Sequence, residues 1–383
     1  MSRPLTSCLV FGCAVVLGAV STFGSAGCLT SNVDPGLGTE AGTAPAAVVG
    51  DPTKNEGNKD AIPYRDLATH PGCTTAGLDS RKASSYVPAT IPNYKCAAKA
   101  YPLVNEDVKK PIVLLMHGNS STPADWEKFP DANGLPMLAD RLSAQGFRVL
   151  AVDVRYDKVD DPHADNKTEN AGLNFDHGWG VPIMEHFIDS VMTAFPDRQL
   201  SLVGFSVAPT MARDALRRLH RAGKKPFERF ESLVFGAGSH HGVSSFRALC
   251  GTNPTMRGKI ACELGDRTSF TPTTFLAPLN GPNGAWETPC ADGDTAYGQK
   301  GVCGGHKVNY TTVVMKDVQE GTYQDEFVSE GSSKLSGATN TTVGLTDNDL
   351  SNYFYNGLFK NHMGSIRSDA ALKIIVKALG GAE

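Results

Sequence analysis

An apolar run meets a helical pattern in Gln199-Leu-Ser-Leu-Val-Gly-Phe-Ser206-Val-Ala-Pro-Thr-Met-Ala-Arg-Asp-Ala-Leu-Arg-Arg-Leu219. The apolar run ends at Gly204, and Ser206 follows before residues such as Leu216 and Leu219 recur at helical spacing. A strand, a tight turn with a serine at its apex and a helix form the context of a nucleophilic serine. The alternative is a serine that only caps the helix after a buried strand. Other parts of the chain must decide between the two.

Small residues flank this serine in the pattern Gly-x-Ser-x-Ala. Gly204 and Ala208 keep bulk away from a turn that is strained at the serine. The helix that follows points free N–H groups and a partial positive charge toward the serine. A pattern this short arises by chance about once in a few hundred residues, so it needs partners elsewhere in the chain.

A second motif follows the all-apolar run Pro111-Ile-Val-Leu-Leu-Met116, which predicts a strand buried on both faces. His117, Gly118 and Asn119 come next, at the carboxyl end of the strand, where open α/β sheets bind their ligands. Gly118 lets the backbone approach closely. We expect the N–H groups of Asn119 and Val207 to stabilise an oxyanion. We interpret His117 as a structural residue that fixes this loop.

The rest of the chain alternates between helical and strand patterns. We expect helices over 135–145 and 181–195, and strands over 147–153, 231–235 and 308–315. This order predicts an α/β fold with a mostly parallel central sheet and helices on both faces. Residues 61–110 are interpreted as an N-terminal extension with an early strand. Residues 248–307 are rich in Gly, Pro and Cys, and we expect a disulfide-pinned, cap-like excursion over the pocket.

A histidine and an acid follow the serine in the chain. Asn361-His362-Met-Gly364 precedes an apolar final helix over 370–379, which places His362 in the loop before that helix. Asp325 follows the late strand, and Asp317 is the alternative acid. Serine becomes a nucleophile when a histidine takes its proton, and the acid holds that histidine's tautomer. We therefore predict a triad of Ser206, Asp325 and His362.

Two other groups of side chains could contribute. His240 and His241 stand in a glycine-rich loop after the 231–235 strand, where they could contact substrate or compete for the role of base. The polar segment 155–179 carries several Asp and His residues, but their spacing matches no metal-ligand framework, so we interpret it as a solvated loop. We expect neither a metal nor an organic cofactor.

The start of the chain has the pattern of an export signal. Arg3 precedes an apolar stretch over 9–20, and Ser25-Ala-Gly-Cys28 follows. Ala-Gly-Cys resembles the end of a bacterial lipobox, although Ser25 replaces its usual leucine. Residues 1–28 are thus predicted to be a signal peptide, with lipidation of Cys28 and plain secretion as alternatives. Residues 29–60 read as a flexible linker, and 61–383 as one domain.

Cysteine number and charge agree with export. Three of the nine cysteines lie in the signal region, and the remaining six are Cys73, Cys96, Cys250, Cys262, Cys290 and Cys303. An even number in an exported chain indicates disulfides, and nearest-neighbour pairing is the simplest of the 15 possible arrangements. The formal net charge of −4, with both signs scattered, gives no case for binding nucleic acid. We expect a monomer.

From about residue 111 onward the chain resembles the α/β-hydrolase superfamily. Within it, the chain is similar to small bacterial lipases of the class 2 type and to a related extracellular polyhydroxybutyrate depolymerase. The resemblance is carried by Met116-His-Gly-Asn119, Gly204-Phe-Ser-Val-Ala208, the Asp325 loop and Asn361-His-Met-Gly364. It implies hydrolysis of carboxylic esters through an acyl-serine intermediate, without a cofactor.

The sequence thus predicts an exported, secreted or lipid-anchored serine esterase or lipase that acts on an ester or lipid-like substrate. A serine peptidase or an acyltransferase on the same fold is one alternative. A non-catalytic surface lipoprotein that retains the fold is another. The long excursion over 248–307 departs from the minimal lipases, so a chain-length preference does not follow from the resemblance.

Overall fold

The structure is a computed structural model. It describes residues 66–75, 89–119, 121–127, 136–155, 177–243, 246, 263–264, 275–280, 287, 306–316, 325–344 and 360–383. The predicted signal peptide, the linker, Asp317, nearly all of the 155–179 segment and most of the 248–307 excursion lie outside these residues.

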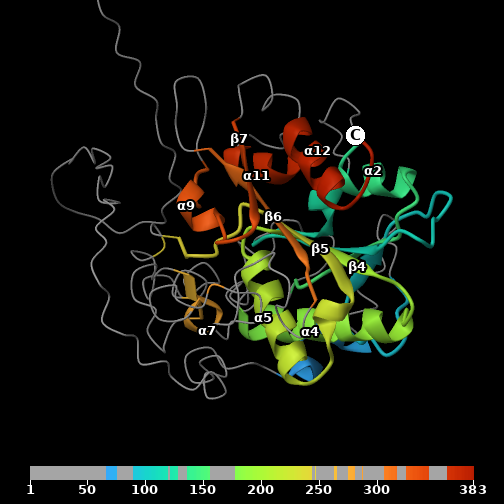
Figure 1. Cartoon of the computed structure of the whole chain (residues 1–383). Helices are drawn as coiled ribbons and strands as arrows, with labels where there is room; N and C mark the ends of the chain where they lie inside the picture. The colour runs from blue at the N-terminus through green and yellow to red at the C-terminus, as the bar shows by residue number, and fades with distance from the viewer. Residues whose placement is uncertain are drawn as a thin grey trace, which may run out of the picture. The chain divides into compact units, whose positions relative to one another are not determined.

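A seven-stranded sheet organises the chain in the order β1-β3-β2-β4-β5-β6-β7 (Figure 1). Its strands are β1 (Ala98–Ala100), β2 (Ile112–Met116), β3 (Val149–Val152), β4 (Leu200–Phe205), β5 (Phe230–Gly236), β6 (Asn309–Met315) and β7 (Thr339–Val343). Neighbouring strands are parallel, except that β1 runs antiparallel to β3. In register, Met116 at the end of β2 lies beside Gly204 near the end of β4, so both predicted motifs leave the same edge of the sheet.

The central strands are apolar because both of their faces are covered. In β2, Ile112, Leu114 and Met116 belong to one hydrophobic cluster, whereas Val113 and Leu115 belong to the other. Successive side chains of a strand point to opposite faces, so a strand with helices on both sides needs apolar residues at every position. The unbroken apolar run of β2 therefore reflects its central place in the sheet, where both faces are covered.

Helices cover the two faces separately. α4 (His177–Ala194) and α5 (Ala208–Arg221) contribute to the first cluster, and α2 (Leu138–Ala144) and α12 (Asp369–Ala378) contribute to the second. α11 (Lys360–Arg367) precedes α12 and adds Ile366 to the second cluster. The short elements are α7 (Ala277–Asn280), α9 (Glu330–Ser333) and the 3-10 turns η1 (Leu67–Thr69), η2 (Pro71–Cys73), η3 (Pro123–Trp126) and η5 (Pro226–Glu228).

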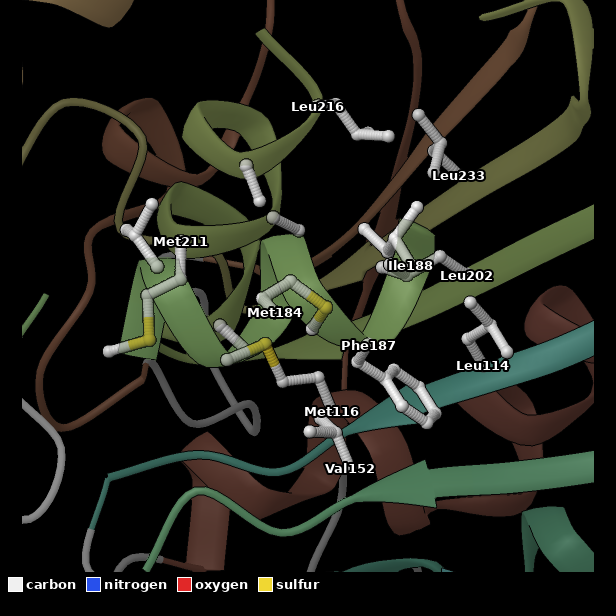
Figure 2. Close-up of a cluster of buried hydrophobic side chains, with 14 of the residues drawn as sticks. Leu114, Met116, Val152, Met184, Phe187, Ile188, Leu202, Met211, Leu216 and Leu233 are labelled. Atoms are coloured by element: carbon white, nitrogen blue, oxygen red, sulfur yellow. The ribbon is translucent and has the colours of Figure 1, made fainter. Parts of the chain in front are cut away.

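The first cluster fixes α5, the helix that starts next to Ser206. Figure 2 shows Met184 and Phe187 of α4 and Met211 and Leu216 of α5 gathered beside apolar side chains of the sheet, such as Leu202. Burial of one such side chain contributes about 1.5–3 kcal/mol relative to exposure. The start of α5 is therefore held rigidly against the sheet.

The predicted fold class is confirmed. A mostly parallel sheet carries helices on both faces, and a sharp turn at a serine joins β4 to α5. This arrangement is that of the α/β-hydrolase fold. The cysteines expected to pin the excursion lie outside the described residues, so that part of the prediction stays a prediction.

The boundaries of several elements differ from those predicted. α2 begins at Leu138, because Met137 is extended and serves as the N-cap residue. α4 already includes His177, four residues before the predicted start near 181, and the Glu263 carboxylate accepts the backbone N–H of His177 at 3.2 Å. β7 and α9 were not predicted, since β7 is short and polar and α9 forms a single turn.

One disulfide lies within the described part of the chain. It joins Cys73 to Cys96, the nearest-neighbour pairing expected for these two residues. In the same part of the chain, no helix has the combination of length and apolar character that crossing a bilayer requires.

Candidate active site

Ser206 occupies a strained turn between β4 and α5. Its φ of 63° lies in the left-handed region, which costs about 1–3 kcal/mol for a residue other than glycine. Two backbone hydrogen bonds, one to the last residue of β5 and one from the loop that follows β5, hold Ser206 in this conformation. The Ser206 N–H donates to the Gly236 carbonyl at 3.0 Å, and the Ser239 N–H donates to the Ser206 carbonyl at 3.2 Å. The turn thus projects the serine side chain from the end of the strand.

The structure brings the three predicted triad residues into one hydrogen-bonded line. The Ser206 Oγ lies 2.8 Å from His362 Nε2, and His362 Nδ1 lies 2.7 Å from Asp325 Oδ2. An ionised carboxylate can only accept, so Nδ1 carries the imidazole proton and Nε2 is free to accept the serine hydroxyl. This tautomer is the one that a general base for the serine requires.

Asp325 is itself fixed by the chain that follows it. Its Oδ1 accepts the backbone N–H groups of Phe327 at 2.7 Å and Val328 at 2.8 Å. The other oxygen, Oδ2, is then left for His362. Asp325 and His362 are buried, whereas Ser206 is partly exposed. The base and the carboxylate that orients it are therefore shielded from solvent, whereas Ser206 remains partly accessible.

His362 lies in the first turn of α11 and not in a loop, which corrects the sequence prediction. Gly236 at the end of β5 allows this helix to approach, because a Cβ there would lie 2.5 Å from Ile366 Cγ2. The Glu326 carboxylate accepts the backbone N–H groups of Asn361 at 3.0 Å and His362 at 2.7 Å. The sequence analysis assigned no role to Glu326. Its position directly after the triad acid was the available signal.

The loop after β2 lies against the serine. A Cβ on Gly118 would lie 2.7 Å from Phe205 Cδ1 and 3.1 Å from Ser206 Cβ, so only glycine fits there. Asn119 follows within this loop, and Val207 is the N-cap residue of α5. The first N–H groups of a helix have no partner inside it. The N–H groups of Asn119 and Val207 thus come from the two segments that meet at Ser206.

His117 is a buried, neutral residue at the base of this loop. Its Nε2 accepts the Val154 N–H at 3.3 Å, and its Nδ1 donates to the Gly118 carbonyl at 3.1 Å. Burial lowers the pKa of His117, although Asp153 and Asp125 oppose the shift. These contacts tie the loop to the end of β3, as the interpretation of His117 as a structural residue requires.

Within the described residues, neither His240 nor His241 makes a hydrogen bond to the Ser206 hydroxyl. His240 is fully buried, and burial next to Arg213 lowers its pKa well below 6.5. Neither of its ring nitrogens has a hydrogen-bond partner within the described residues. His241 binds Glu287 through Nε2 at 2.9 Å. His362 is the ring that reaches Ser206.

A second line of carboxylate, imidazole and hydroxyl was not foreseen. Glu263 Oε2 binds His177 Nδ1, and His177 Nε2 lies 2.9 Å from Thr210 Oγ1. The Thr210 hydroxyl donates to the Val207 carbonyl at 2.7 Å. Phe275 packs over the His177 ring, with the ring centroids 3.6 Å apart. Glu263 and Phe275 belong to the 248–307 excursion, which is therefore joined to the starts of α4 and α5.

Metal ligation has no candidate among the described residues. No group of three or more His, Cys, Asp or Glu side chains is placed there to hold an ion. The acidic residues of the 155–179 segment that could ligate one, such as Asp160 and Asp165, lie outside those residues.

No family model and no curated protein matches the chain. Among solved structures, it is similar to the mature Bacillus licheniformis lipase BlEst2, with 17% identity and a TM-score of 0.45 over 74% of this chain and 97% of that one. Lipase B of Aspergillus fumigatus gives 14% identity and a TM-score of 0.46 over 79% and 63% of the two chains. Bacillus subtilis carboxylesterase CesB gives 14% and 0.37 over 80% and 95%. At this level the likeness does not extend to the activity of this chain.

Proposed function

We propose that the protein is a serine hydrolase that cleaves carboxylic esters through an acyl-serine intermediate. The observation that carries the proposal is the hydrogen-bonded line from Ser206 through His362 to Asp325. It starts at a partly exposed serine with positive φ, at the turn from a central strand into a helix. A serine that merely capped α5 would have no need of a buried imidazole and carboxylate behind it.

In the proposed acylation step, the Ser206 Oγ attacks the ester carbonyl carbon while His362 Nε2 takes the hydroxyl proton. Asp325 holds the imidazolium that forms. The N–H groups of Asn119 and Val207 stabilise the negative charge on the carbonyl oxygen. The tetrahedral intermediate then expels the alcohol, which receives the proton from His362, and Ser206 remains acylated.

Deacylation repeats the same proton transfers with water. His362 takes a proton from the attacking water, and the acyl carbon again passes through an oxyanion next to Asn119 and Val207. Collapse of this intermediate releases the carboxylic acid and returns the proton to the Ser206 Oγ. The cycle uses only side chains and backbone groups of the chain, so the proposal needs no metal or organic cofactor.

The site of action is also a proposal. The leader pattern of residues 1–28 supports export, and the Cys73–Cys96 disulfide is compatible with an oxidising compartment. The protein would then be secreted or held at the envelope through a lipid on Cys28, with an ester or lipid-like substrate. Cleavage of a polyhydroxybutyrate-type polyester remains a prediction from the sequence resemblance.

The proposal is tested by steady-state and pre-steady-state hydrolysis of p-nitrophenyl butyrate, with the matching p-nitroanilide as a second substrate. We expect ester turnover with an initial burst of nitrophenol, because the acyl-serine accumulates. Faster turnover of the anilide would support the alternative of a serine peptidase. A folded protein that hydrolyses neither substrate would leave the alternative of a non-catalytic lipoprotein.

A further inference from the structure

The dipeptide Asp325-Glu326 contacts His362 twice, in two different ways. Asp325 binds the imidazole through Nδ1 at 2.7 Å, and Glu326 binds the backbone N–H of the same histidine at 2.7 Å. Glu326 also accepts the N–H of Asn361 at 3.0 Å through its other oxygen. One short segment thus holds both the ring and the backbone of the proposed base.

Glu326 provides hydrogen-bond acceptors for backbone N–H groups at the start of α11. The first N–H groups of a helix have no acceptor within it, and a negative charge at this end is favourable. Lys360, Asn361 and His362 are the first three residues of α11, so Glu326 satisfies two of these N–H groups from a distant segment. The start of the helix is thereby fixed relative to Asp325.

The position of that helix start decides the position of the imidazole. The His362 ring has to lie within hydrogen-bond distance of both Ser206 and Asp325, and each contact is shorter than 3 Å. Asp325 can draw the ring toward itself but cannot set the distance from Nε2 to Ser206. That distance follows from where the backbone of residue 362 lies, and Glu326 fixes this point.

From these contacts we propose that Glu326 is a positioning residue for His362. It sets the backbone of the base, while Asp325 sets its tautomer and ring orientation. The proposal rests on the proposed function, because it assigns a role within that same site. Glu326 is exposed, and its hydrogen bonds go to the backbone at the start of α11, so it acts on the reaction through the position of His362.

The test compares three variants in p-nitrophenyl butyrate hydrolysis. Glu326→Ala removes both acceptors, and Glu326→Gln keeps one acceptor oxygen without the charge. Ser329→Ala is the matched control: its exposed hydroxyl oxygen accepts the Ser332 N–H at the start of α9, so it removes a helix-end acceptor from the same segment without touching α11.

We expect Glu326→Ala to lower kcat about tenfold with KM changed less than about twofold, because misplacing the base weakens the transition state and not substrate binding. Glu326→Gln should recover part of that loss, and Ser329→Ala should keep the wild-type kcat. A wild-type kcat in Glu326→Ala would overturn the proposal, as would an equal loss of kcat in Ser329→Ala.

Hydrogen exchange at the Asn361 and His362 amides separates this inference from the proposed function. We expect both amides to exchange faster in Glu326→Ala and unchanged in Ser329→Ala. If the wild type hydrolyses no ester, the proposed function fails, and the exchange data still report on Glu326. Unchanged exchange in Glu326→Ala would overturn its role in fixing the start of α11.

Discussion

Two lines of carboxylate, imidazole and hydroxyl run through the molecule. One joins Asp325 to His362 and Ser206, and the other joins Glu263 to His177 and Thr210. In both, Nδ1 of the ring faces the carboxylate and Nε2 faces the hydroxyl. Composition and order therefore do not distinguish a catalytic line from a structural one.

The difference lies in the surroundings of the hydroxyl. Ser206 is partly exposed at a strained turn, whereas Thr210 is fully buried inside α5. The Thr210 hydroxyl already donates its hydrogen to the Val207 carbonyl. It has neither a proton to give to His177 nor a surface from which to reach a carbonyl carbon. The two lines therefore differ in whether the hydroxyl is accessible to a substrate and whether its proton is available to the imidazole.

The largest expected effect comes from removing the two hydroxyls in turn. Ser206→Ala should lower kcat by about 10⁶-fold, because the nucleophile is lost. Thr210→Val should change kcat by less than about tenfold, because its hydroxyl holds backbone and not substrate. Steady-state hydrolysis of p-nitrophenyl butyrate measures both. A loss of turnover in Thr210→Val comparable to that in Ser206→Ala would break the distinction.

The two carboxylates give the next effect when each becomes an amide. Asp325→Asn should lower kcat about 10⁴-fold with little change in stability, because the amide favours the wrong imidazole tautomer. Glu263→Gln should instead lower the free energy of unfolding by about 1–3 kcal/mol and leave kcat within about tenfold. Urea denaturation followed by activity assays measures both quantities. Reversed effects would exchange the roles of the two lines.

The sequence predicted the first line but not the second, and the reason is physical. Ser206 stands in a local motif, and Asp325 and His362 follow it in an order that one known chemistry explains. Glu263 and His177 are 86 residues apart, and their contact has no local pattern.

The fold class was predictable because a strand buried on both faces is apolar at every position, and a single stretch such as Ile112–Met116 shows this in the sequence. Polar strands such as Thr339–Val343 carry no such signal, since only Val343 is buried. The role of Glu326 was hidden for another reason. An acidic residue in a loop becomes a helix acceptor only when tertiary structure brings a helix start to it.

A moderate effect is expected from breaking the buried pair of the second line. His177→Ala leaves the Glu263 carboxylate buried without its imidazole, which should lower the free energy of unfolding by about 3–5 kcal/mol. Replacing both residues with apolar ones, as in the double variant His177→Phe with Glu263→Leu, should recover most of the lost free energy of unfolding. Chemical denaturation of the single and double variants measures the difference. A double variant as unstable as His177→Ala would contradict a purely structural pairing.

The smallest effect concerns His240, a buried imidazole that has neither a carboxylate nor a hydroxyl partner among the described residues. Burial lowers its pKa well below 6.5, so the folded chain leaves it neutral while the unfolded chain binds a proton below that pH. His240 therefore lowers the free energy of unfolding as the pH falls below about 6.5, by up to about 1.4 kcal/mol per pH unit. His240→Phe should therefore show a shallower loss of stability between pH 7 and pH 5. Parallel stability profiles for wild type and variant would contradict this.

Covalent modification by a fluorophosphonate identifies which hydroxyl is the nucleophile. We expect one adduct on wild-type protein, located on Ser206 by peptide mass spectrometry, with none on Thr210. Ser206→Ala should take up no label, and Thr210→Val should be labelled like wild type. An adduct that persists in Ser206→Ala, or a folded wild-type protein that takes up no label, would contradict the assignment of Ser206 as the nucleophile.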